Sequence, residues 1–167
     1  MKKLVVYFSY TSNTKRIAEL IQKNLECDIL EIKPVIPYSD DYQKVVDEEQ
    51  NNSSIDKIIE IEKINLDLNN YDELIIGTPV WWYSMAPAIR TFLKNNDLSR
   101  KIIKPYATNA GWLGHTFNDI KKLCPNSQVK DGMNIVFESY SDKLVTSEEE
   151  IKNWIENLKK NNNKKII

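Results

Sequence analysis

Short apolar runs alternate with amphipathic segments along most of the chain. The runs are rich in Val, Ile, Leu and aromatic residues and end at polar or proline-containing loops, which is typical of buried strands. The predicted strands are Lys2–Phe8, Asp28–Lys33, Leu74–Gly77, Lys101–Thr108 and a weaker Val129–Phe137, which Asp131 and Gly132 interrupt.

Apolar residues at helical spacing predict helices between these strands. Thr14–Leu25 has Ser12 or Asn13 available as its N-cap, and Ala86–Leu93 tolerates Pro87 in its first turn. His115–Leu123 shows the same periodicity. The last helix is the clearest, because Ser147 can cap it, three glutamates follow, and residues 151, 154, 155 and 158 form one apolar stripe.

This order of elements predicts an α/β fold. Strands that alternate with helices favour a doubly wound, five-stranded parallel sheet with helices on both faces. We expect a single domain over residues 1–160 and a frayed tail at 161–167. The polar stretch Tyr38–Leu68 is interpreted as an elaborated crossover, with a possible helix near Asp41–Glu49 and an apolar run at Ile55–Ile64.

Composition argues against several classes of function. The 167 residues carry 23 basic and 24 acidic side chains, a net charge of −1, so no basic footprint for nucleic acid is present. The four glycines are scattered, which excludes a dinucleotide fingerprint or a P-loop. Two distant cysteines and one histidine argue against a disulfide scaffold or a zinc site. No apolar stretch is long enough for a membrane span, and we expect a reduced cytoplasmic protein.

Three loops at the carboxyl ends of predicted strands are candidate ligand sites. The first, Ser9–Thr14, is rich in hydroxyl groups and leads into a helix N-terminus, where backbone N–H groups favour an anion. It contains no lysine, so a terminal monophosphate suits it better than a triphosphate with magnesium. The alternative is that these residues only cap the helix.

The other two loops suit a flat ligand. Gly77–Pro87 contains the consecutive aromatic residues Trp81, Trp82 and Tyr83, which could stack on a planar heterocycle, fill space under a loop, or contact a protein. Thr108–His115 holds two of the glycines, so its backbone could approach the edge of such a ligand. The alternative is a turn that needs positive φ.

These loops resemble those of the flavodoxin family. Ser9–Thr14 is similar to the flavodoxin phosphate loop, commonly written Ser/Thr-x-Thr-Gly-Asn-Thr, and Gly77–Trp82 is similar to the Trp-Trp loop of a flavodoxin subfamily. Segments 37–42, 108–114 and 119–125 also resemble that subfamily, and the resemblance spans about Lys2–Leu158. It implies the strand order 2-1-3-4-5 with FMN at the point where the order reverses.

The resemblance implies a noncovalent FMN and no catalytic acid, base or metal. It places the phosphate at Ser9, Thr11, Ser12, Asn13 and Thr14, and the ribityl chain near Thr78 and Pro79. It places the isoalloxazine ring among Val80, Trp81, Trp82, Tyr83, Thr108, Asn109, Ala110, Gly111 and Gly114.

Two residues depart from the family pattern. Ser12 occupies the position of the phosphate-loop glycine, which requires either a negative φ or a tolerated strain. Tyr83 follows the Trp pair where subfamily members often have glycine. Outside the loops, we interpret His115 as a helix cap or surface residue and Cys124 as part of the core.

The implied function is a low-potential electron carrier, a monomer or weak dimer, between cytoplasmic reductases and acceptor enzymes. An FMN-dependent NAD(P)H:quinone, azo or nitro reductase on the same fold is the alternative. A non-redox module that contacts proteins through Trp81, Trp82 and Tyr83 is a third hypothesis. The net charge of −1 is small for a carrier. The acidic cluster Asp40, Asp41, Asp47, Glu48 and Glu49 is interpreted as a solvated helix face.

Overall fold

A parallel sheet forms the centre of the computed structural model, which describes residues 1–51 and 58–160. Four strands lie in the order β2-β1-β3-β5, and both β6 and β7 pair with β5, so together they occupy a fifth position. The predicted order 2-1-3-4-5 is therefore confirmed. The strands are β1 Lys3–Tyr7, β2 Asp28–Glu31, β3 Glu73–Trp81, β4 Ser84–Met85, β5 Ile102–Asn109, β6 Gln128–Val129 and β7 Met133–Val136.

The ends of most strands lie within two residues of the predicted ends, whereas β3 is much longer than predicted. The break between β6 and β7 coincides with Asp131 and Gly132, as the sequence indicates. By contrast, β3 continues past Gly77 to Trp81 and forms a short antiparallel hairpin with β4. The aromatic segment that the sequence predicts to be a loop is therefore largely a β-hairpin.

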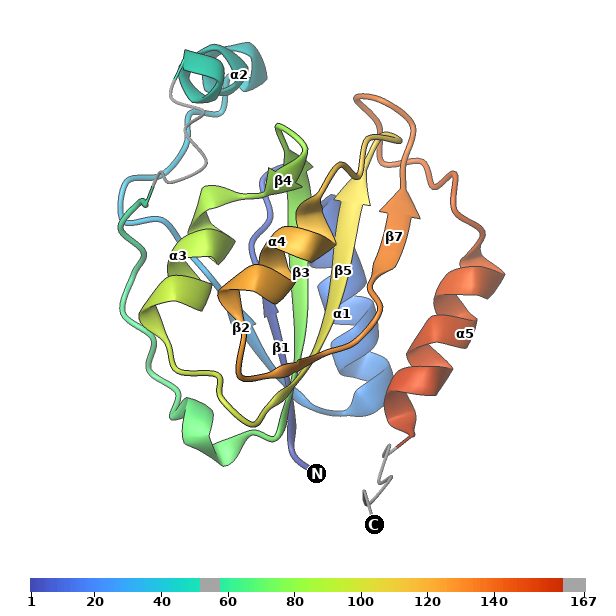
Figure 1. The fold of residues 1–167 in the computed structure, drawn as a ribbon. Coiled ribbons are helices and arrows are strands. Elements are labelled where there is room, and N and C mark those ends of the chain that lie inside the picture. Colours follow the sequence, from blue (N-terminus) through green and yellow to red (C-terminus); the bar gives the residue numbers. More distant parts are fainter. Residues whose placement is uncertain (52–57, 161–167) are drawn as a thin grey trace.

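Helices cover both faces of the sheet (Figure 1). One face carries α1 and α5, and the other carries α3 and α4. The last helix begins as predicted, because the Ser147 hydroxyl accepts a hydrogen bond of 3.1 Å from the Glu150 N–H. The helices are α1 Asn13–Leu25, α2 Tyr42–Asn51, α3 Pro87–Asn95, α4 Thr116–Leu123 and α5 Glu148–Lys159, with a 3₁₀ turn at Leu68–Asn70.

Strand β1 shows why the central strands are apolar without interruption. Val5 and Tyr7 belong to the core cluster between the sheet and helices α1 and α5, while Leu4 and Val6 belong to the cluster between the sheet and helices α3 and α4. Because both faces of a parallel sheet are covered by helices, consecutive residues of a central strand are all buried. Burial raises the pKa of the Tyr7 hydroxyl to about 12.

The elaborated crossover contains α2, which confirms the predicted helix near residues 41–49. After α2, Ile59, Ile61 and Ile64 pack against the core on the α3 face. Residues 55–57 of the predicted apolar run, and the predicted frayed tail 161–167, lie outside the described residues. The assignment of residues 1–160 to a single domain remains a prediction.

A buried ion cluster lies at the amino ends of the central strands. Glu73 is fully buried, and its Oε1 lies 3.1 Å from Lys104 Nζ and 3.7 Å from Lys3 Nζ. Burial lowers the pKa of Lys3, although the charge of Glu73 opposes that change. The hydrophobic pattern gives no sign of this cluster. Glu73 and Lys104 are single charged residues within strands that are otherwise apolar around them, and the sequence does not show that the two strands lie side by side.

The acidic residues of the crossover are not all solvated. Asp40, Asp41, Asp47 and Glu48 are exposed, but Glu49 is buried, so the interpretation as a solvated face is wrong for that residue. Cys124 is buried, as expected, and burial raises the pKa of its thiol to about 11. Among the described residues, no helix is long and apolar enough to cross a membrane.

Candidate functional site

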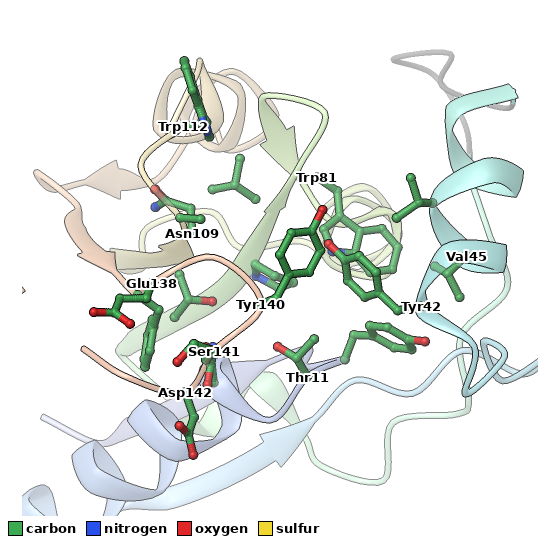
Figure 2. Close-up of a pocket in the computed structure, with 18 of the residues that line it drawn as sticks. Thr11, Tyr42, Val45, Trp81, Asn109, Trp112, Glu138, Tyr140, Ser141 and Asp142 are labelled. Carbon is green, nitrogen blue, oxygen red and sulfur yellow. The ribbon is translucent and has the colours of Figure 1, made fainter. Parts of the chain in front are cut away.

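The three loops singled out in the sequence meet at one cavity of about 1000 Å³, at the carboxyl ends of β1, β3 and β5 (Figure 2). This is where the strand order reverses, the usual ligand position in an open parallel sheet. The predicted residues that line the cavity are Thr11, Asn13, Pro79, Val80, Trp81, Trp82, Tyr83, Thr108, Asn109 and Ala110.

Six predicted residues do not line the cavity: Ser9, Ser12, Thr14, Thr78, Gly111 and Gly114. Three of their hydroxyl groups are used inside the protein. Ser9 Oγ accepts from the Lys15 N–H at 3.2 Å, and Thr14 Oγ1 lies 2.8 Å from Thr108 Oγ1. Thr78 Oγ1 accepts from the Ala86 N–H at 3.0 Å. Each of these three hydroxyl groups therefore has a partner within the protein that fixes the local backbone or strand contact.

The first loop presents backbone donors. Among the described residues, no oxygen accepts a hydrogen bond from the N–H groups of Ser12, Asn13 or Thr14. They lie at the N-terminus of α1, whose first turn contains no acidic side chain. Free N–H groups and the positive end of the helix dipole make this turn suitable for an anion.

Residues of β5 and of the segment after β7 form hydrogen bonds to this first turn. The Tyr106 hydroxyl donates to the Thr14 carbonyl at 2.9 Å, and the ring reaches it because Gly77 has no Cβ, which would lie 2.1 Å from Tyr106 Cζ. On the other side of the turn, the Asn13 side-chain amide donates a hydrogen bond to the Ser141 carbonyl at 3.0 Å. The Asn13 amide is thus engaged by the protein, while its backbone N–H remains available.

Ser12 has the conformation that glycine would favour. Its φ of 73° lies in the left-handed region, and its side chain makes no capping hydrogen bond. The departure from the family glycine is therefore a strained position rather than a rearranged loop. Neither Ser12 nor Asn13 caps α1 through its side chain, which corrects the sequence-based expectation.

We expect Ser12→Gly to raise the free energy of unfolding by about 1 kcal/mol, because glycine adopts positive φ without a steric cost. Urea denaturation measures this change. The matched control is Ser12→Ala, which also removes the hydroxyl but keeps the Cβ and should give no gain. A Ser12→Gly protein no more stable than Ser12→Ala would show that the strain is absent.

Aromatic side chains form one wall of the cavity. Trp81 packs edge-on against Tyr38, Phe8 and Tyr10, with ring centroids 5.0, 5.6 and 6.1 Å away. Trp82 and Tyr83, at the tip of the hairpin, are 37% and 56% exposed. Trp81 is thus anchored by the core, while its two neighbours remain available to contact a flat ligand.

The third loop presents both side chains and backbone to the cavity, at Asn109, Ala110 and Trp112. Asn109 Oδ1 accepts from the Gly111 N–H at 2.8 Å, which closes a tight turn. Gly111 has a φ of 115°, and a Cβ there would meet no atom within 4 Å. The conformational explanation for this glycine is therefore correct, and the bare backbone beside Ala110 still borders the cavity.

Several lining residues were not predicted from the sequence. They come from Tyr10, from α2 and from the segments that follow β5 and β7. Tyr42 of α2 and Tyr140 contact one another edge to face, with ring centroids 5.5 Å apart (Figure 2). Ligands bind at the carboxyl ends of parallel strands, so the same rule, applied to the last strand, would have indicated the segment around Glu138 and Tyr140. The unpredicted residues are Tyr10, Tyr42, Val45, Val46, Trp112, Phe137, Glu138, Tyr140, Ser141 and Asp142.

The donor set fits a ligand with an anionic end and a planar end. The anion would meet the N-terminus of α1, and the planar part would lie between the aromatic hairpin and the bare backbone near Gly111. Within the described residues, no group of three or more His, Cys, Asp or Glu side chains could hold a metal ion.

Comparisons with known proteins identify the family and similar folds. A protein-family model described as flavodoxin matches residues 2–158. A search of curated proteins found no significant match. A structure from Bacteroides eggerthii, described as a flavoprotein, is 28% identical with a TM-score of 0.77, covering 96% of this chain and 99% of that one.

Two further structures are similar. A Lactobacillus acidophilus flavoprotein in complex with FMN is 25% identical, with a TM-score of 0.65 and coverage of 80% of this chain and 92% of that one. Flavodoxin 2 from Bacillus cereus is 18% identical, with a TM-score of 0.56 and coverage of 93% and 95%, which is a likeness of fold.

Proposed function

Because this chain belongs to the flavodoxin family, we propose that it binds FMN noncovalently and carries electrons between cytoplasmic redox proteins. One observation supports this most directly: a helix N-terminus with free backbone donors and an aromatic hairpin line the same cavity. A similar flavoprotein has been solved in complex with FMN. We expect the protein to act as a monomer or weak dimer.

In this proposal the first turn of α1 holds the phosphate. The Thr11 side chain and the backbone N–H group of Asn13, which line the cavity, would contact it, and the free N–H groups of Ser12 and Thr14 lie beside them in the same turn. The ribityl chain passes Pro79, while Thr78 keeps its role of fixing the hairpin. Each contact is made without a metal ion or a basic side chain.

The planar ring would be held by the other two loops. Trp82 and Tyr83 would contact one side of it, and the backbone of Asn109 and Ala110, next to Gly111, would meet its edge. Bound FMN supplies the redox chemistry, and the protein orients it, excludes water from it and supplies hydrogen bonds. Stacked aromatic rings and low polarity disfavour added negative charge, which lowers the reduction potential.

The side chains around the cavity favour a carrier over a stand-alone reductase. Among the described residues, no Lys, Arg or His lines the cavity, so it offers no cation for the phosphate groups of a nicotinamide dinucleotide. Asp142 and Glu138, which pairs with Lys143 at 3.2 Å, are exposed cavity-lining acids that could attract a basic partner.

Steady-state kinetics separates the two functions. We expect the FMN-loaded protein to oxidise NADPH or NADH only slowly when a quinone is present and no reductase is added. Adding a flavin reductase should start rapid reduction of the bound FMN, which is measured as a decrease in flavin absorbance. Rapid turnover of NAD(P)H and quinone by the protein alone would overturn the carrier proposal in favour of a reductase.

A further inference from the structure

The turn that carries Trp82 and Tyr83 has a strained backbone. Both residues have positive φ angles, 46° for Trp82 and 64° for Tyr83. A two-residue turn between antiparallel strands usually places glycine, asparagine or aspartate in this region, because bulky side chains are disfavoured there. Such a conformation persists only when its surroundings hold it in place.

The loop before α4 holds the main chain of this turn. The His115 N–H donates to the Tyr83 carbonyl at 2.8 Å. Gly114 packs so closely that a Cβ on it would lie 2.3 Å from the same carbonyl oxygen. Gly114, predicted to contact the ring of the cofactor, thus fits the backbone of the turn instead.

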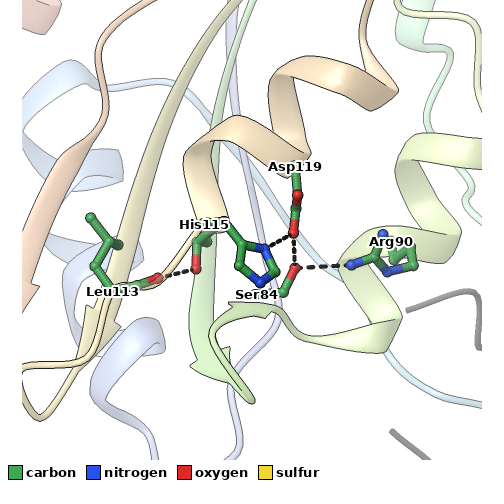
Figure 3. A network of polar contacts seen from close by, with 6 residues as sticks. Ser84, Arg90, Leu113, His115 and Asp119 are labelled. Carbon is green, nitrogen blue, oxygen red and sulfur yellow. Dashed lines mark hydrogen bonds and ion pairs between the residues drawn. The ribbon is translucent and has the colours of Figure 1, made fainter. Parts of the chain in front are cut away.

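A cluster of polar side chains holds the next residue of the hairpin (Figure 3). The Ser84 hydroxyl donates to Asp119 Oδ2 at 2.6 Å and accepts from Arg90 Nη2 at 2.9 Å. His115 Nδ1 contacts the same Asp119 oxygen. Ser84 and Arg90 are only 7% and 8% exposed, so water competes little for these bonds.

The cluster connects three elements through Asp119. Burial, the largest single influence, acts to raise the pKa of Asp119. The hydrogen bonds from Ser84 and His115, together with the charges of His115 and Arg90, act in the opposite direction. Their combined effect is larger, so the pKa of Asp119 is lower than its usual value. The carboxylate is therefore ionised at neutral pH and joins β4, α3 and α4. None of these four side chains lines the cavity.

We propose that Ser84, Arg90 and Asp119 are positioning residues that keep the Trp82–Tyr83 turn closed on the ring-binding end of the cavity. The proposal rests on the proposed function, because the same site is involved. The cluster orders the turn before a ligand arrives, so binding does not have to order it. Its effect is confined to the planar end of the ligand and does not reach the phosphate.

Asp119→Asn tests this, because it keeps the shape of the side chain and removes the charge. We expect the Kd values for FMN and for riboflavin to rise by the same factor, about tenfold, since both ligands carry the ring. Flavin fluorescence titration measures both, at a temperature where circular dichroism shows the variant folded. The turn amides of residues 83–85 should also exchange hydrogen faster in the apoprotein.

A double-mutant cycle separates positioning from general support of the fold. Tyr83→Gly relieves the strain at the second of the two turn residues, so Asp119→Asn should weaken riboflavin binding less than about threefold in that background. If Asp119→Asn does not fold, Ser84→Ala replaces it, with Ser84→Thr as the variant that keeps the hydroxyl and should retain affinity.

Two results would overturn the proposal: unchanged Kd values for both ligands in a folded Asp119→Asn protein, or the same loss with and without Tyr83→Gly. Failure of the wild-type protein to bind either flavin would instead refute the proposed function. Amide exchange needs no ligand, so it tests the positioning role even if the protein binds no flavin. Slower or unchanged exchange at residues 83–85 in the Asp119→Asn apoprotein would contradict that role.

Discussion

We expect Thr11→Asp to lower the affinity for FMN at least about 100-fold while changing the affinity for riboflavin less than about threefold. Thr11 is exposed and lines the cavity beside the free N–H groups of Ser12 and Asn13. A carboxylate there repels the phosphate of FMN, whereas riboflavin has no phosphate to repel. Fluorescence titration of the apoprotein with each flavin measures the two affinities.

The matched control is Thr11→Asn, which has nearly the same shape without the charge. We expect it to bind FMN within about fivefold of the wild-type protein, since backbone donors at the start of α1 carry most of the phosphate binding. If Thr11→Asp weakened FMN and riboflavin equally, the phosphate would lie elsewhere. That result would contradict the assignment of the first loop.

The second large effect concerns stability. We expect Glu73→Gln to lower the free energy of unfolding by about 3–5 kcal/mol, because it leaves Lys104 buried without a countercharge. Lys104 and Lys3 are both nearly buried around the Glu73 carboxylate. Urea denaturation of the apoprotein measures the loss.

Removing the orphaned charge should restore stability. The double variant Glu73→Gln, Lys104→Met should recover at least about half of the loss, since a buried ion pair can often be replaced by apolar side chains of similar volume. The affinity of the folded double variant for FMN should match that of the wild-type protein, because the cluster lies at the opposite end of the strands. A loss below about 1 kcal/mol for Glu73→Gln would mean that this ion cluster is not desolvated.

The sheet could be predicted because local and tertiary requirements agree. The run around Val5 and Val6 is apolar at every position, and a strand buried on both faces has this pattern. The last helix could be predicted for the same reason, since its cap at Ser147 and its apolar stripe indicate one structure. The position of the cavity followed from strand order, once the three loops had been recognised.

The aromatic hairpin could not be predicted from its own residues. Trp82 and Tyr83 contradict the usual turn chemistry, and the contacts that impose their conformation come from Gly114, His115 and Asp119, far along the chain. A pattern of three aromatic residues also cannot show that Trp81 faces the core while its neighbours are exposed. Tertiary contacts decide both points.

The roles of hydroxyl groups were also beyond the sequence. Ser9, Thr14 and Thr78 look like ligand groups by position, but each hydroxyl makes a hydrogen bond within the protein, to Lys15, Thr108 and Ala86 respectively. Conversely, Tyr42 and Tyr140 were not predicted to line the site, and only the fold brings their rings together at the cavity. Spacing identifies loops that can meet, whereas the partner of each side chain depends on the packing.

Titration of the apoprotein with FMN tests the central claim most directly. We predict that FMN fluorescence is quenched and that quenching saturates at one FMN per chain, because the ring stacks against the aromatic side chains of the hairpin. Absence of quenching and of binding at high micromolar FMN would contradict the account.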